Sequence, residues 1–315
     1  MGDVLSAQTD RQPSGTWGCG PSLQGQLDLF AHSRAVILLN DVIDSLLEPN
    51  TARVRERLQL LRDEAPGHPT LNALETLREA LEKQPVATTG AGDTAKVVDW
   101  LESEVAPAAS ALGSSASTFM RSRWRALALT VAAQAYDPAY PRAHCAYCHL
   151  RAEDAPAALR AVASIHGSDL DPFVLQWVTL ARHRTSGRHA CRAPLFTLAL
   201  NTPQHLPAVL TELADPALHD DWERFWLDCA WLDPRDAAAG AWFPAWYLIE
   251  HRAMRFDEPV GTADPEAAPA KAFDAARLLL VLEPAGYGPT LIGARARLHD
   301  IDARLFAHYM SRRGS

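Results

Sequence analysis

The chain has 315 residues, of which 48% are hydrophobic and 22% are charged, with 22 prolines and 17 glycines. These proportions exclude a collagen-like or wholly disordered chain, and the length suits two ordinary domains or one extended array. The formal net charge of −8 gives the protein no general attraction to nucleic acid. We therefore expect a folded protein with no nucleic-acid partner.

The sequence also predicts a protein that does not enter a membrane. It contains no apolar run of about 18 residues, the length that a helix needs to cross the bilayer. Residues 1–20 lack the basic and apolar regions of a secretory signal. Five cysteines, an odd number in a chain of this length, do not form a disulfide framework. A reducing cytoplasm is the simplest compartment for such a chain.

The first third of the chain divides into three segments. Residues 1–24 are polar and rich in glycine, proline and serine, which predicts a mobile N-terminal arm. Across residues 25–83, apolar residues recur at three- and four-residue steps in three segments with short connections, which predicts an N-terminal three-helix unit. Residues 84–117 hold two stretches of small and polar residues around one short helix, and we expect a linker there.

Residues 118–315 predict a C-terminal helical domain in which Asp-Pro recurs as a helix-start signal. An aspartate that precedes a helix accepts hydrogen bonds from the free N–H groups of the first turn. Proline suits the first helical position because it has no N–H group to satisfy. The five Asp-Pro pairs lie at 137–138, 171–172, 215–216, 233–234 and 264–265. No stretch shows the strict alternation of a strand between hairpin turns.

One segment of this region, residues 140–172, resembles a tetratricopeptide repeat. The first two Asp-Pro pairs are 34 residues apart, which is the period of that repeat. Small and apolar residues would lie along its two helices: Ala143, Tyr147 and Leu150 on the first, Ala157, Ala161 and Ile165 on the second. The resemblance implies antiparallel helical pairs that stack, because one pair cannot bury its own apolar stripe. We therefore predict an all-α fold with an irregular repeat array.

Aromatic residues are densest between residues 222 and 247, where five of the nine tryptophans occur. Two Trp pairs there have the four-residue spacing of one helical face. One interpretation is a dense core between two helices. The other is the floor of a groove for a peptide or planar ligand, with charged residues at its rim. The candidate partner-binding residues are Trp222, Arg224, Trp226, Trp242, Trp246, Glu250 and His251.

Two of these candidates, Glu250 and His251, also form a carboxylate–imidazole pair that could serve an enzyme. Successive residues on a helix point about 100° apart. We therefore do not expect Glu250 and His251 to face one small site together.

The sharpest local motif is Cys145-Ala-Tyr-Cys148-His149, which matches the attachment pattern of a c-type haem. A second interpretation is a zinc site, since Cys145 and Cys148 share a helical face and zinc takes four N or S ligands. His144, His189 and Cys191 could supply further ligands. A third is that the cysteines are small buried residues of a helix. We expect no cofactor, with zinc on Cys145, Cys148 and His149 as the alternative.

Established catalytic signatures are missing from the sequence, which has no HExxH, GxSxG, Walker A or GxGxxG motif. The first functional hypothesis is therefore a non-catalytic scaffold that binds a protein or peptide on the surface of a helical array. The alternative is a metalloprotein or enzyme whose site forms only in three dimensions, around Cys145, Cys148 and His149. A third hypothesis is a homodimer held by exposed apolar helix faces.

Overall fold

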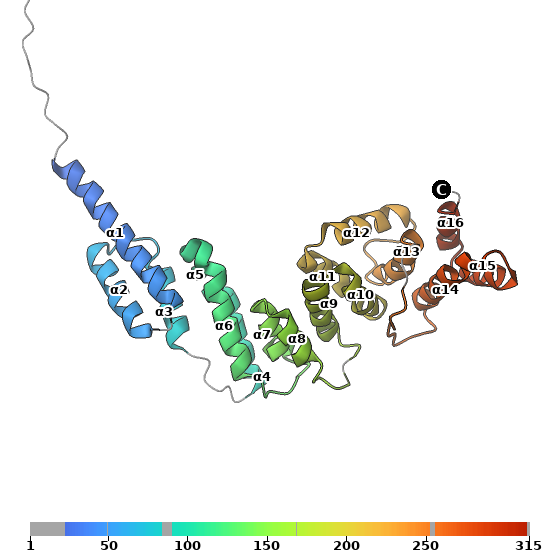
Figure 1. The fold of residues 1–315 in the computed structure, drawn as a ribbon, viewed down its shortest axis with the longest axis horizontal. Helices are drawn as coiled ribbons and strands as arrows, with labels where there is room; N and C mark the ends of the chain where they lie inside the picture. The colour runs from blue at the N-terminus through green and yellow to red at the C-terminus, as the bar shows by residue number, and fades with distance from the viewer. Residues whose placement is uncertain (1–22, 49, 84–89, 168, 253–255, 314–315) are drawn as a thin grey trace, which may run out of the picture. The chain divides into compact units, whose positions relative to one another are not determined.

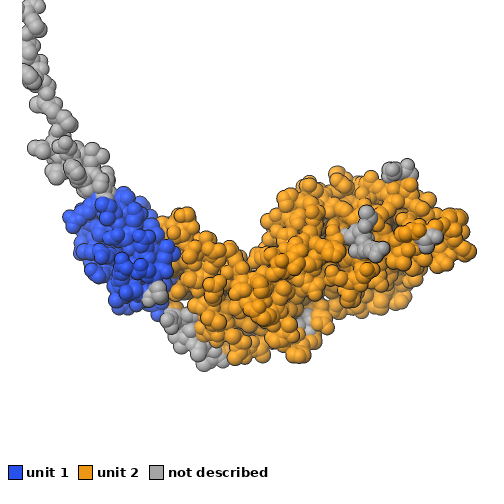
Figure 2. Space-filling model, viewed as in Figure 1, with its two compact units in different colours: residues 1–82 blue, residues 83–315 orange. Residues whose placement is uncertain are grey.

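The computed structural model describes residues 23–48, 50–83, 90–167, 169–252 and 256–313, and Figure 1 shows its helices in chain order. These residues form helices and turns, with no strand among them, so the predicted all-α class is confirmed. The arm predicted for residues 1–24 lies outside the described residues, apart from the two that begin the first helix. The chain divides into two compact units at Glu82, coloured blue and orange in Figure 2.

The first unit contains three helices, as the apolar periodicity predicts: α1 (Leu23–Leu47), α2 (Thr51–Glu64) and α3 (Leu71–Glu82). Helix α2 begins at an asparagine cap, because the Asn50 side chain accepts a hydrogen bond from the N–H group of Arg53. Leucines at three- and four-residue steps, such as Leu58 and Leu61 of α2 and Leu74 of α3, are fully buried. Burial of this apolar stripe holds the three helices together.

The second unit begins with more helix than the single short one predicted for the linker at residues 84–117. Residues 90–130 form α4 (Ala91–Trp100), a π-helical turn, α5 (Ala106–Ala109), a 3₁₀ turn and α6 (Ala116–Thr130). The alanines and serines of residues 107–117 belong to the predicted linker, but these residue types raise the free energy of a helix only slightly. The helical path breaks at Gly113, whose φ of +56° lies in the left-handed region that glycine tolerates.

Helical pairs then follow one another, and each helix packs against its neighbours in the chain (Figure 1). The helices are α7 (Cys145–Arg151), α8 (Ala155–Val162), α9 (Pro172–Ser186), α10 (Arg188–Asn201), α11 (Leu206–Leu213) and α12 (Pro216–Asp228). The alternate helices α7, α9 and α11 also contact one another in order. Successive helical pairs therefore stack along an irregular array, and no finer family assignment follows from this packing.

Four further helices complete the array: α13 (Phe243–Glu250), α14 (Ala268–Leu282), α15 (Pro289–Ile301) and α16 (Ala303–Ser311). Helix α13 packs on α14, α14 on α15, and α15 on α16. Asp302 ends α15 with extended backbone, and its side chain caps α16. A single aspartate therefore separates the last two helices.

The Asp-Pro signal is correct at two of its five positions. Asp171 and Asp215 cap α9 and α12, and each side chain accepts hydrogen bonds from two N–H groups of the first turn. Asp137, Asp233 and Asp264 accept a hydrogen bond from the N–H group two residues later, but no α-helix starts there. Aspartate forms such turns without a helix, and further proline or aspartate residues nearby interrupt helical continuation.

The contribution of an aspartate cap to stability can be measured at Asp154. Asp154 caps α8 through a hydrogen bond from the N–H group of Ala157. We expect Asp154→Ala to lower the free energy of unfolding by about 1 kcal/mol, because the first turn loses this acceptor. Urea unfolding followed by circular dichroism measures the change. Asp264→Ala is the control, since it removes a side-chain hydrogen bond from a backbone N–H group, that of Glu266, without uncapping a helix. An equal loss in both variants would contradict the assignment.

Candidate functional site

Three neighbouring hollows lie in the second unit, and each shares at least one lining residue with the next. The first, of about 420 Å³, lies along the start of α4, and the second, of about 180 Å³, shares Asp99 and Tyr140 with it. The third, of about 260 Å³, shares Arg142 with the second. The three hollows therefore follow one another from α4 to α11.

The third hollow, which we call the apolar hollow, is built by the alternate helices α7, α9 and α11. Its walls are Arg142, Tyr147, Leu150, Arg151, Phe173, Gln176, Trp177, Leu180 and Glu212. Aromatic and leucine side chains form most of this lining, and a few polar groups stand among them. Such a mixture is typical of sites that bind a ligand through apolar contact and orient it through hydrogen bonds.

The floor of the apolar hollow is held rigidly from beneath. Trp177 is buried, and the His144 ring stacks on it with 5.9 Å between ring centroids and a 9° angle. His144 also caps α7, because its Nδ1 accepts a hydrogen bond from the Ala146 N–H group. Burial lowers the pKa of His144 to about 4, so the ring is neutral at physiological pH and keeps this acceptor.

The rim of the apolar hollow carries a network centred on Glu102. The Tyr147 hydroxyl donates to one Glu102 oxygen, and Arg142 donates to the other at 2.7 Å. Arg142 also donates to Asp99 at 2.8 Å. Burial, and next the hydrogen bond to Glu102, raise the pKa of Tyr147, so this phenol stays protonated. On the far side, Gln176 donates to Glu212 at 2.8 Å.

The structure places the tryptophans of residues 222–247 in a packed aromatic cluster. Trp246 is fully buried, and its ring lies near Phe225 and Phe243, with centroid distances of 5.7 and 5.9 Å. The other predicted tryptophans, Trp222, Trp226 and Trp242, are half-buried against the same core. Arg224 is exposed on α12. This packing favours the core interpretation, while a partner-binding role for these residues stays a prediction.

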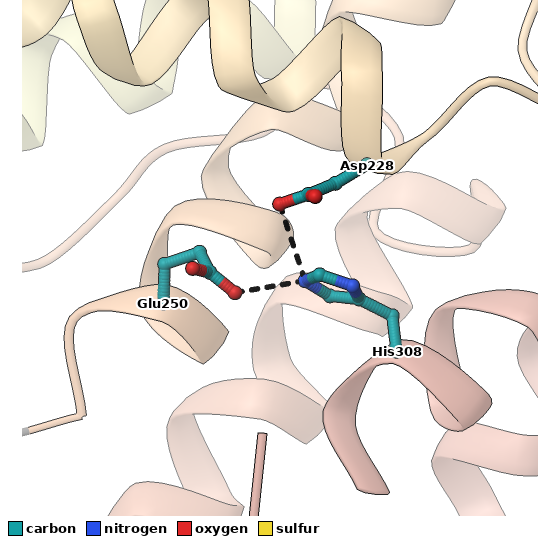
Figure 3. Close-up of side chains that lie close together, drawn as sticks. All are labelled: Asp228, Glu250 and His308. Atoms are coloured by element: carbon teal, nitrogen blue, oxygen red, sulfur yellow. Dashed lines mark hydrogen bonds and ion pairs between the residues drawn. The ribbon is translucent and has the colours of Figure 1, made fainter. Parts of the chain in front are cut away.

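The two remaining predicted rim residues lie in separate ion-pair groups, since Glu250 ends α13 and His251 follows it with non-helical backbone. His251 approaches the buried Asp221, with 3.1 Å between Nε2 and Oδ2. Glu250 instead pairs with His308, whose Nε2 lies 2.8 Å from Glu250 Oε1 and 3.9 Å from Asp228 Oδ2 (Figure 3). Glu250 and His251 therefore take part in two different contacts.

Asp228, Glu250 and His308 come from α12, α13 and α16, and Figure 3 shows their side chains converging. Of the described residues, they alone form a group of three metal-ligand types whose ligand atoms lie within 4.8 Å of one another. Arg312 already supplies a cation here, with Nε 2.7 Å from Glu250 and Nη2 3.3 Å from Asp228. Burial opposes the charged form of Glu250, but the hydrogen bonds from His308 and Arg312 outweigh it and hold the pKa of Glu250 below its ordinary value. A metal ion would have to displace Arg312. We call this group the ion-pair clamp, because His308 and Arg312 join the end of α16 to Glu250 of α13 and Asp228 of α12.

The cysteine motif is placed in the core of the second unit. Cys145 and Cys148 are buried on α7, and burial raises the pKa of both thiols, which keeps them protonated. Burial likewise lowers the pKa of His149. Within the described residues, their ligand atoms do not gather with a third ligand within 4.8 Å. The packing favours small buried residues, and zinc binding stays a prediction.

Comparison with protein-family models, with curated proteins and with solved structures gives no match. Among the described residues, no helix combines the length and apolarity of a membrane span. The function is therefore inferred from the geometry of the chain itself.

The apolar hollow is not predicted from the sequence, although some of its lining residues belong to the tetratricopeptide-like segment. Tyr147 and Leu150 appear in the tetratricopeptide-like segment as packing residues, and Trp177 lies in the next helical pair. The available signal was the presence of aromatic residues on two alternate helices, Tyr147 on α7 and Phe173 and Trp177 on α9. It becomes a site only when α7, α9 and α11 are placed side by side.

Proposed function

We propose that this protein is a non-catalytic adaptor that binds an extended peptide segment of a partner protein across the three neighbouring hollows. The observation that carries the proposal is their succession from α4 to the apolar hollow, in which each hollow shares at least one lining residue with the next. A row of neighbouring hollows suits a chain of side chains better than one compact ligand. The apolar hollow, at about 260 Å³, is below the usual size of a small-molecule site.

The packing of the array supports the same proposal. Alternate helices of stacked pairs present a continuous surface, which repeat proteins commonly use for extended partners. Trp177 is buried and stacks on the buried His144 ring, which supports a surface that is organised before a partner arrives. A preorganised site loses less conformational entropy on binding.

A selection with phage-displayed random peptides tests the proposal. We expect the full-length protein to enrich peptides that share a bulky apolar residue, because the apolar hollow buries one. Gln176→Trp should lower the affinity of the enriched peptides at least tenfold, since the half-buried Gln176 lines the hollow and an indole would fill it. Fluorescence anisotropy with a labelled peptide measures the affinity.

The matched control is Arg160→Trp, which adds the same ring to an exposed position of α8 that lines none of the three hollows. It should leave peptide affinity unchanged. Enrichment of no peptide, or equal losses in the two variants, would overturn the proposed function.

A further inference from the structure

Arg151 stands out on the rim of the apolar hollow because its hydrogen-bond donors are not engaged. Its Nε lies 3.8 Å from Glu102, beyond hydrogen-bonding distance. No other described residue accepts a hydrogen bond from its guanidinium. The side chain is 42% exposed, so a ligand in the hollow can reach it.

Arg151 shares Glu102 with two closer donors. Both carboxylate oxygens of Glu102 already accept a hydrogen bond, one from Tyr147 and the other from Arg142. Arg142 is in turn engaged by Asp99. Arg142 therefore has two carboxylate partners at hydrogen-bonding distance. Arg151 has only the more distant carboxylate of Glu102.

The guanidinium of Arg151 nevertheless has an aromatic contact on one face. It lies over the ring of Trp124, 5.6 Å from the ring centroid, in a cation–π contact. Trp124 is buried, so this support is rigid. A planar guanidinium with free N–H groups matches the geometry of a carboxylate, to which it can donate two parallel hydrogen bonds.

We propose that the peptide bound in the hollows carries an aspartate or glutamate side chain beside the bulky residue that fills the apolar hollow, and that Arg151 binds this carboxylate. The inference rests on the proposed function and names the chemistry of its ligand. The apolar hollow gives affinity, and the free guanidinium at its edge selects the charge of the neighbouring residue.

The test starts from peptides selected at the N-terminus of a phage coat protein, where a displayed peptide has no free C-terminal carboxylate. We expect enrichment of an acidic residue beside the apolar one. A synthetic, C-terminally amidated peptide should lose about tenfold in affinity when its acid becomes the amide. That difference should vanish in Arg151→Gln, which removes the charge and keeps most of the side-chain stem.

Arg121→Gln is the matched control, because Arg121 is 40% exposed and pairs with Glu153 away from the three hollows. It should preserve the preference for the acid. Enriched peptides that fill the hollow without an acid preference would overturn this inference and leave the proposed function standing. A preference that persists in Arg151→Gln, or that requires a free C-terminus, would also overturn it. Failure to enrich any peptide would remove both proposals.

Discussion

Trp246→Ala is expected to lower the free energy of unfolding by about 3–5 kcal/mol, the usual cost of removing a fully buried large aromatic side chain. The indole is 0% exposed and packs among the rings of Phe225 and Phe243. Its N–H group also donates to Asp228 at 3.2 Å, so the substitution leaves that carboxylate with one donor fewer. Urea unfolding monitored by circular dichroism measures the loss.

Leu227→Ala on α12 is the control for Trp246→Ala, because Leu227 is 79% exposed and should change stability by less than about 0.5 kcal/mol. A Trp246→Ala variant as stable as the unsubstituted protein would contradict the core assignment. Lost peptide affinity in such a stable variant would favour the partner-binding interpretation of the tryptophan-rich segment.

Glu250→Gln is expected to lower the free energy of unfolding by about 1.5–3 kcal/mol at neutral pH, the range for hydrogen bonds to a charged group. The substitution keeps the shape of the side chain and removes the charge that His308 and Arg312 share. Equilibrium unfolding over a range of pH measures the effect. Glu266→Gln is the control, since that carboxylate is 81% exposed and its pair with Lys271 contributes little.

The effect of Glu250→Gln should depend on pH in a defined direction. The pKa of Glu250 in the folded protein is below its ordinary value of 4.5, chiefly through hydrogen bonds from His308 and Arg312 that outweigh burial. As the pH falls, the unfolded chain takes up the proton first, so the stabilisation is fully present above about 4.5 and is lost below it. The stability difference between the two proteins should therefore shrink in acid. A constant difference across this range would contradict the clamp.

Much of the fold follows from local sequence signals. Leucines at helical spacing predict α1 to α3, and the aspartates at positions 171 and 215 predict the starts of α9 and α12. These signals depend only on residues within one or two turns, so the chain displays them directly. The Asp-Pro prediction fails at Asp137, Asp233 and Asp264 because the same side-chain hydrogen bond also closes a turn without a helix.

The candidate site depends on contacts that the sequence does not display. Glu102 and Tyr147 are 45 residues apart, yet their hydrogen bond organises the rim of the apolar hollow. Glu250 reaches His308 across 58 positions, so its imidazole partner is a distant residue and not the adjacent His251. Periodicity identifies which face of a helix is apolar, but it does not say which helices meet.

The most direct test of the proposed function is to map where a selected peptide binds. The peptide would carry a benzophenone beside its apolar residue and be photo-crosslinked to the full-length protein, and mass spectrometry would locate the joined residues. We expect cross-links to residues that line the apolar hollow, such as Tyr147, Phe173 and Gln176. Cross-links confined to Trp222 and Trp226 would contradict it and return the binding surface to the tryptophan-rich segment.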